Sequence, residues 1–156
     1  MSFVQYENNV KVAILGSSVG ITTTGFANVT GLSLPMMASS VYEFEFEIIY
    51  QSSATTRGPG FGVNGPASPS FVLVHTEIPT SLTAVTQGMQ RAYDTGTGVT
   101  AIDTANANCY ARCYGYVSNG TTAGDLILRC KINNTGTITI QPGSVMKMWR
   151  VNPSDA

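Results

Sequence analysis

Charged side chains are scarce in this 156-residue chain: they make up 11 % of the residues, with 8 Lys and Arg against 9 Asp and Glu. Soluble domains typically carry about 25 %. The net charge of −1 and the pI near 5.7 lack the basic surplus of nucleic-acid-binding domains, whose pI exceeds about 9, so we expect no nucleic-acid partner. Hydroxyl and amide groups must supply the polar surface, and the chain contains 19 Thr, 14 Ser and 10 Asn.

Long apolar runs are also missing. No segment approaches the 18 or so consecutive apolar residues of a membrane-spanning helix, so we expect no membrane partner. The opening residues MSFVQYENNVKVAIL have neither a basic start nor an apolar run of seven or more residues. This argues against a secretory signal, and we expect synthesis in the cytoplasm of the producing cell.

Metal-ligating residues are few, with three cysteines and one histidine, His75. Cys109 and Cys113 lack the C-x-x-C spacing of zinc sites, and on one strand they would lie about 13 Å apart, too far for a disulfide. A bond from either to Cys130 remains open, but we favour three buried free thiols. We therefore expect no metal and no cofactor.

Two short motifs match catalytic or nucleotide-binding patterns but lack the required context. Residues 16–20 read G-x-S-x-G, yet the Thr-rich segment after them is a poor helix start, which a nucleophile elbow requires. Residues 60–65 read G-x-G-x-x-G, yet Pro66 and Pro69 prevent a helix from opening there. A glycosidase would need paired acids in different environments, which a uniform glutamate row does not provide. We expect no catalytic residues and no enzymatic activity.

Alternation with a period of two dominates the sequence. In residues 42–48, aromatic and aliphatic side chains occupy one face of the expected strand and three glutamates the other. Similar patterns recur at 10–15, 70–78, 109–117, 126–132, 137–140 and 145–151. Val, Ile and Thr, which favour strands, form more than a quarter of the chain.

Turn-forming Gly, Pro, Asn and Asp residues separate these segments, and only 81–93 offers a weak case for a helical turn. The pattern predicts an all-β fold of about eight strands, a jelly-roll-like antiparallel β-sandwich. We assign residues 10–151 to this single domain, residues 1–9 to an N-terminal arm and residues 152–156 to a C-terminal tail.

The few charges are grouped by strand face. Glu43, Glu45 and Glu47 form an acidic row. The basic residues lie on other strands: Arg129 and Lys131 share one face of their strand, and Arg112 shares a face with tyrosines. If the strands are neighbours, opposite rows balance each other. Two interpretations remain open: a solvated outer face with some ion pairs, or a subunit interface, where Tyr and Arg are enriched. The interface candidates are Glu43, Glu45, Glu47, Arg112, Tyr114, Tyr116, Arg129 and Lys131.

Five segments together resemble a known group of proteins. Residues 123–129 (AGDLILR) and 136–151 (GTITIQPGSVMKMWRV) are similar to the closing strands of β-sandwich structural proteins in tailed-bacteriophage virions. Residues 42–50 with the loops ATTRG and VNGP resemble an early strand and loop of the same group. The resemblance spans roughly residues 41–151, and the first 40 residues lie outside it.

This resemblance implies a virion component. The first expectation is a capsid decoration, or cement, protein on the capsid surface, where it forms a homotrimer and bridges copies of the major capsid protein. The alternative is a tail-fibre or receptor-binding domain that recognises a host glycan, with Tyr110, Tyr114, Tyr116 and Trp149 as the aromatic candidates.

Overall fold

The computed structural model describes residues 10–151 and consists of twelve strands joined by turns and loops. Within these residues there is no helix, and hence none that could cross a membrane. The predicted arm and tail at 1–9 and 152–156 lie outside the described residues. The strands are β1 (Val10–Ile14), β2 (Val19–Ile21), β3 (Ala27–Met36), β4 (Val41–Ser52), β5 (Pro59–Asn64), β6 (Phe71–Pro79), β7 (Val85–Gln90), β8 (Gly96–Gly98), β9 (Cys109–Ser118), β10 (Gly124–Ile132), β11 (Ile138–Ile140) and β12 (Val145–Arg150).

Strand pairing is nested along the chain. β1 pairs with β12, β2 with β11, β3 with β10, β4 with β9, β5 with β8 and β6 with β7, all antiparallel. The chain is thus one long folded hairpin with β6 and β7 at its tip. Rolling this hairpin up creates the further pairs of β12 with β4, β10 with β5 and β6 with β9. This is the topology of a jelly roll, which confirms the predicted fold class.

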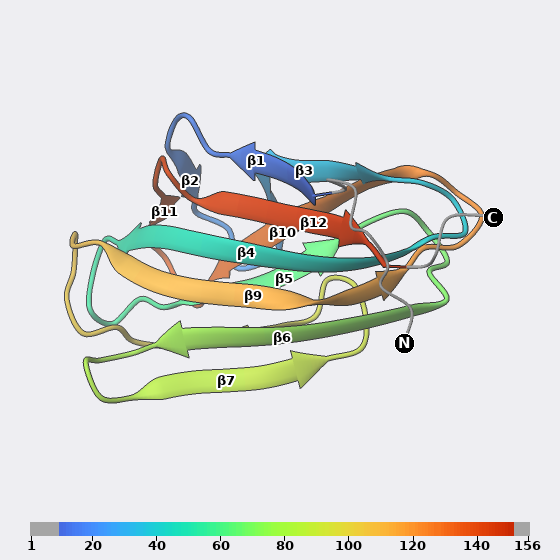
Figure 1. Ribbon diagram of the computed structural model, residues 1–156. Coiled ribbons are helices and arrows are strands. Elements are labelled where there is room, and N and C mark those ends of the chain that lie inside the picture. Colours follow the sequence, from blue (N-terminus) through green and yellow to red (C-terminus); the bar gives the residue numbers. More distant parts are fainter. Residues whose placement is uncertain (1–9, 152–156) are drawn as a thin grey trace, which may run out of the picture.

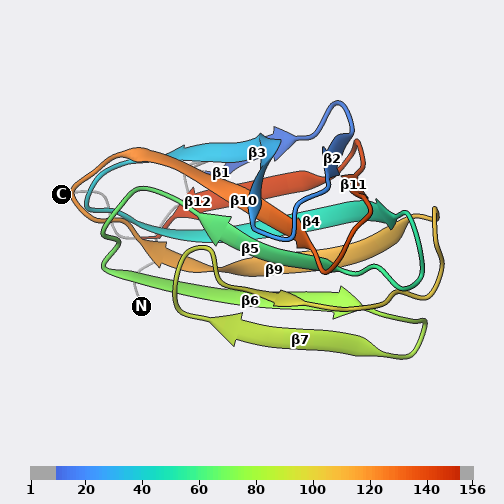
Figure 2. The same cartoon turned by 180° about the vertical axis from the view of Figure 1, so that it is seen from behind.

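The rolled hairpin forms two layers. The large sheet has the order β1-β12-β4-β9-β6-β7, with β2 and β11 attached beside β4, and the small sheet has the order β3-β10-β5-β8. Figure 1 shows the large sheet in front, and Figure 2, from behind, shows β3, β10 and β5 in front of it. One side of each sheet therefore faces the other, and one side faces outward.

The core lies between the layers and follows the alternation of the sequence. On β4, Tyr42, Phe44, Phe46, Ile48 and Tyr50 are buried while the intervening residues are partly exposed. Phe61 from β5 packs edge-to-face against Tyr50, with ring centroids 5.7 Å apart. Aromatic pairs of this kind stabilise by about 0.5–1.5 kcal/mol beyond their burial.

Several local predictions need correction. The structure has twelve strands rather than about eight, because short strands such as β2 and β8 and the glycine-containing β5 carry a weak alternation signal. The alternation of the longer β3 is interrupted at Gly31, whose φ is 101°. Residues 81–93 form no helical turn; β7 occupies 85–90, since pairing with β6 outweighs local propensity. Residues 59–64, which overlap the G-x-G-x-x-G motif and lie outside the alternating segments, form β5.

Candidate functional site

The predicted acidic row lies on the outer side of the large sheet, beside the strand that carries Arg112. In the β4–β9 register, Glu43 is opposite Tyr116, Glu45 opposite Tyr114 and Glu47 opposite Arg112. Pairing with β6 extends the same rows outward across the sheet. The sheet register therefore brings six of the eight predicted residues together on one surface, the outer face of the large sheet.

Arg112 balances part of the acidic row within the chain. Its guanidinium lies 3.2 Å from a Glu45 carboxylate oxygen and 3.7 Å from one of Glu47. The Tyr110 hydroxyl donates a 2.5 Å hydrogen bond to Glu47. Arg112 also stacks over the ring of Tyr114, 4.4 Å from its centroid, a cation–π contact. The acidic row and Arg112 thus meet between neighbouring strands of one protomer. For Arg112, this meets the condition stated from the sequence, that opposite charges balance if their strands are neighbours.

These contacts perturb the protonation of the groups involved. A hydrogen bond shared with Glu47, and the hydrogen bond and charge of Arg112, lower the pKa of Glu45 against the opposing effect of burial. Burial and the Glu47 carboxylate raise the pKa of Tyr110 to about 12. Near neutral pH Glu45 is therefore an ionised carboxylate beside a guanidinium, and Tyr110 is a neutral phenol.

A second polar cluster continues the row on β6. Nδ1 of His75 lies 2.6 Å from the Tyr114 hydroxyl, and that hydroxyl donates a 3.2 Å hydrogen bond to Glu77. The His75 ring is also 3.6 Å from Glu77 and packs edge-on against Tyr114. The groups fix one another's orientation, so the surface presents a preformed pattern of donors and acceptors.

The network is flanked by exposed apolar side chains at both edges of the sheet. On β1, the side chains of Val10, Val12 and Ile14 are 51–65 % exposed. Monomeric domains rarely leave contiguous apolar area of this kind uncovered, and such surfaces commonly bind other molecules. Most of the exposed large apolar residues belong to this face, namely Val10, Val12, Ile14, Phe71, Leu73, Val85, Met89, Tyr110 and Tyr116.

The other two predicted residues, Arg129 and Lys131, do not join this surface. Both lie on β10, on the outer side of the small sheet. Arg129 pairs with Asp94 at 2.7 Å and donates to the Phe26 carbonyl at 2.8 Å. The condition for balancing the acidic row, that the strands are neighbours, is not met by these two residues, because β10 belongs to the other sheet.

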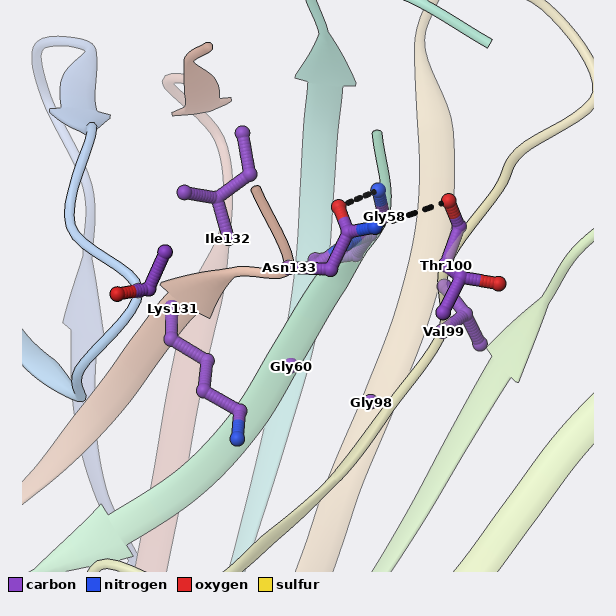
Figure 3. Close-up of a pocket in the computed structure, with 10 residues that line it drawn as sticks. Gly58, Gly60, Gly98, Val99, Thr100, Lys131, Ile132 and Asn133 are labelled. Atoms are coloured by element: carbon purple, nitrogen blue, oxygen red, sulfur yellow. Dashed lines mark hydrogen bonds between the residues drawn. The ribbon is translucent and has the colours of Figure 1, made fainter. Parts of the chain in front are cut away.

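Lys131 lines a cavity of about 360 Å³ on the small sheet. Its stem crosses Gly60, and its ammonium lies 4.8 Å from the centroid of the Phe26 ring. Figure 3 shows Asn133 at the opposite side, bonded to the Gly58 amide and the Thr100 carbonyl. The asparagine is thus engaged in holding two loops together, and Lys131 is the charged group of this cavity.

The thiols offer no reactive centre in this arrangement. All three cysteines are free, with Cys113 and Cys130 buried and Cys109 half-buried. Burial raises the pKa of Cys113 to about 12, so it remains a protonated thiol at neutral pH. Among residues 10–151 no three or more His, Cys, Asp and Glu side chains converge to hold a metal ion.

Comparison with known proteins gives similarity of fold alone. No family model and no curated protein matches the sequence. Similar solved structures include the Eiger TNF protein from S. frugiperda, at 8 % identity, 96 % coverage of this chain, 97 % of that chain and a TM-score of 0.43. Another is the VP2 subviral particle of infectious bursal disease virus, at 11 % identity and a TM-score of 0.43. That alignment covers 92 % of this chain and 33 % of the VP2 chain.

These TM-scores lie below 0.5, and the jelly-roll assignment follows from the strand order of this chain. The chain spans about a third of the VP2 chain that it matches. The resemblance to tailed-bacteriophage proteins remains a prediction.

Sequence reasoning missed the flanking apolar strips. The outward residues Val12 and Met89 lie at opposite edges of the sheet, and β1 ends at residue 14 while β7 begins only at residue 85. Alternation in residues 10–15 was a usable signal for a strand, but nothing in it identified the exposed side.

Proposed function

We propose that this protein is a non-enzymatic virion structural protein: a capsid decoration, or cement, protein that oligomerises on the capsid exterior and bridges capsid subunits. Its partners would be further copies of itself and the major capsid protein. The resemblance implies a homotrimer as the form of this self-association.

The observation that carries the proposal is the outer face of the large sheet. It combines exposed apolar edges with a preformed network of Glu, Arg and Tyr side chains. Tyr and Arg are enriched in protein interfaces, and apolar area supplies most of the affinity there. The row of Glu43, Glu45 and Glu47 lies on an open sheet surface, so the face suits association better than acid–base chemistry.

The mechanism is linkage by mass action. A protein that binds the assembled shell, and not its separated subunits, stabilises the shell in proportion to the logarithm of its concentration over the dissociation constant. A shell offers many equivalent sites, so weak contacts of each copy sum to a large effect. The N-terminal arm is proposed to contribute by adding a strand to a sheet edge of the capsid.

The test is binding to purified capsids that lack this protein. We expect the full chain to co-sediment with them and to raise the temperature at which they release their contents. Removal of residues 1–9 is expected to weaken this binding. Undiminished binding of the truncated protein would refute the role of the arm, and failure of the full chain to bind would refute the decoration function.

A receptor-binding domain is the second candidate, favoured by the Lys131 cavity. Its volume of about 360 Å³ falls within the range of small-molecule sites, and an ammonium group suits a carboxylated sugar. The predicted aromatics Tyr110, Tyr114, Tyr116 and Trp149 lie instead on the large sheet, away from the residues that line this cavity. Binding on a glycan array that disappears in Lys131→Met would support this candidate, and absence of binding by the native protein would refute it.

A further inference from the structure

Six strands of the large sheet lie side by side in the order β1, β12, β4, β9, β6 and β7 (Figure 1). The outward side chains of each of these six strands form one column. The centre of this order lies between β4, with its carboxylates, and β9, with Arg112. One strand further out on each side lie Lys147 on β12 and Glu77 on β6. The outermost columns are apolar, with Val12 on β1 and Met89 on β7.

Rows across the sheet are fixed by the register. Val12, Lys147, Glu45, Tyr114, His75 and Met89 form one continuous row, since each is paired with the next. Reading this row from one end gives apolar, cation, anion, phenol, imidazole and apolar groups. The neighbouring row contains Glu47, Arg112 and Glu77 in adjacent columns.

Two copies can stack such faces about either of two two-fold axes in the plane of the sheet. An axis perpendicular to the strands places every column against itself, so the carboxylates of β4 would meet those of the other copy and repel. An axis parallel to the strands exchanges the two halves of the sheet. It places β4 against β9, β12 against β6 and β1 against β7, with the rows kept in line.

We propose that this chain forms a two-fold dimer through the outer face of the large sheet, with the axis parallel to the strands between β4 and β9. Glu47 then lies opposite Arg112 of the partner subunit. Lys147 lies opposite His75 of the partner subunit and within reach of its Glu77, and Val12 packs on Met89. Stacked sheets pack about 10 Å apart with nearly aligned strands, which suits such interdigitation.

Charge selects the geometry of this dimer, and the apolar edges supply its affinity. Glu43, Glu45, Glu47 and Glu77 outnumber the two cations of the face, Arg112 and Lys147, so two faces do not attract each other by net charge. Complementary charges mainly determine orientation and exclude wrong pairings, whereas buried apolar area drives association. The proposal rests on the self-association proposed above and assigns a surface to it, but it gives that self-association two-fold symmetry in place of the homotrimer that the resemblance implies.

The decisive experiment exchanges two charges that cannot compensate within one chain. Lys147 and Glu77 lie three strand spacings apart, about 14 Å. Lys147→Glu and Glu77→Lys should each weaken dimerisation about tenfold or more, as measured by analytical ultracentrifugation. An equimolar mixture of the two variants should recover the native dissociation constant to within about threefold, because each heterodimer restores opposite charges at both contacts.

Matched apolar variants test the edge contact. Val12→Asp should abolish the dimer, whereas Leu82→Asp, in a loop where the native side chain is 97 % exposed, should leave it unchanged. Trp149, the single tryptophan, lies on the same face beside Glu43, so its emission should shift to shorter wavelength on association. Circular dichroism of each variant establishes that the fold is kept.

Several outcomes would overturn the proposal: a native monomer at micromolar concentration, a trimer, or a variant mixture that fails to recover dimerisation. A monomer that dimerises once residues 1–9 are removed would mean that the chain's own segment covers the face, which also overturns it. Capsid binding is measured separately. A native monomer that still decorates capsids would refute the dimer alone, and a dimer that does not bind capsids would refute the decoration function alone.

Discussion

Gly115 offers a stringent test of the strand register that builds the outer face. It lies on β9 between Phe44 of β4 and Val74 of β6. A Cβ atom added there would lie 1.9 Å from the carbonyl oxygen of Leu73, and real Cβ contacts are essentially never shorter than 3.0 Å. The atom in the way is backbone, so Gly115→Ala cannot be relieved by a side-chain rotation. β6 must move away from β9.

The size of the effect follows from this geometry. Overpacking a well-packed site costs about 1–3 kcal/mol. Loosening the β6–β9 ladder also weakens backbone hydrogen bonds, at about 1 kcal/mol each. We therefore expect the free energy of unfolding to fall by about 2–4 kcal/mol, which corresponds to a Tm lower by roughly 4–16 °C for a chain of this length.

Urea unfolding followed by circular dichroism measures this loss. Gly16→Ala is the matched control, because no atom lies within 4 Å of its added Cβ. The alanine at position 16 should change the free energy of unfolding by less than about 1 kcal/mol. If Gly115→Ala proved as stable as this control, the close approach of β6 to β9 and the rows of the outer face derived from it would be wrong.

Three further perturbations probe other parts of the molecule. Burial raises the pKa of the Cys113 thiol from 9.0 to about 12, so the contribution of this thiol to stability is complete below pH 9. Between pH 9 and 12 the free energy of unfolding should fall by about 1.4 kcal/mol per pH unit on account of Cys113. Urea titrations of Cys113→Ala should show a smaller slope. Arg112→Met should destabilise the fold by about 0.5–1.5 kcal/mol at pH 7. The pKa of Glu45 is lowered in the fold, so the ion pair stabilises the protein above the usual pKa range of Glu, and the difference between the two proteins should shrink as acidification protonates Glu45. An unchanged acid titration would contradict the assigned ion pair. Lys131→Met should cost about 0.5–1 kcal/mol through lost cation–π attraction to Phe26, and thermal unfolding that shows no loss would contradict that contact.

Strongly alternating segments were predictable from sequence because burial of one sheet side imposes a period of two. The run from Tyr42 to Ile48 forms the first part of β4, and its buried and exposed sides are those expected. The glycine-rich β5 escaped prediction, since Gly60 and Gly62 leave no alternation to detect. Their lack of side chains is instead required by packing: the stem of Lys131 covers Gly60, and a Cβ atom at Gly62 would lie 2.6 Å from the carbonyl oxygen of Thr95.

The candidate surface was partly predictable for the same reason. Glu43, Glu45 and Glu47 had to share one side of a strand, and Arg112 had to share a side with the tyrosines of its own strand. Whether two such strands are neighbours depends on pairings between residues far apart in the chain. The structure made Arg112 a neighbour of the acidic row and placed Arg129 in the other layer.

Local alternation, turn chemistry and low charge by themselves determined that this chain forms an antiparallel sandwich whose exterior carries few charges and many hydroxyl groups. They act between residues close in sequence, so the sequence carries them directly. Only the tertiary structure decided the nested strand order, the side on which each apolar strip emerges and the balance of charges across rows. Those properties depend on long-range strand pairing, where a shift of one residue would move every side chain to the opposite face.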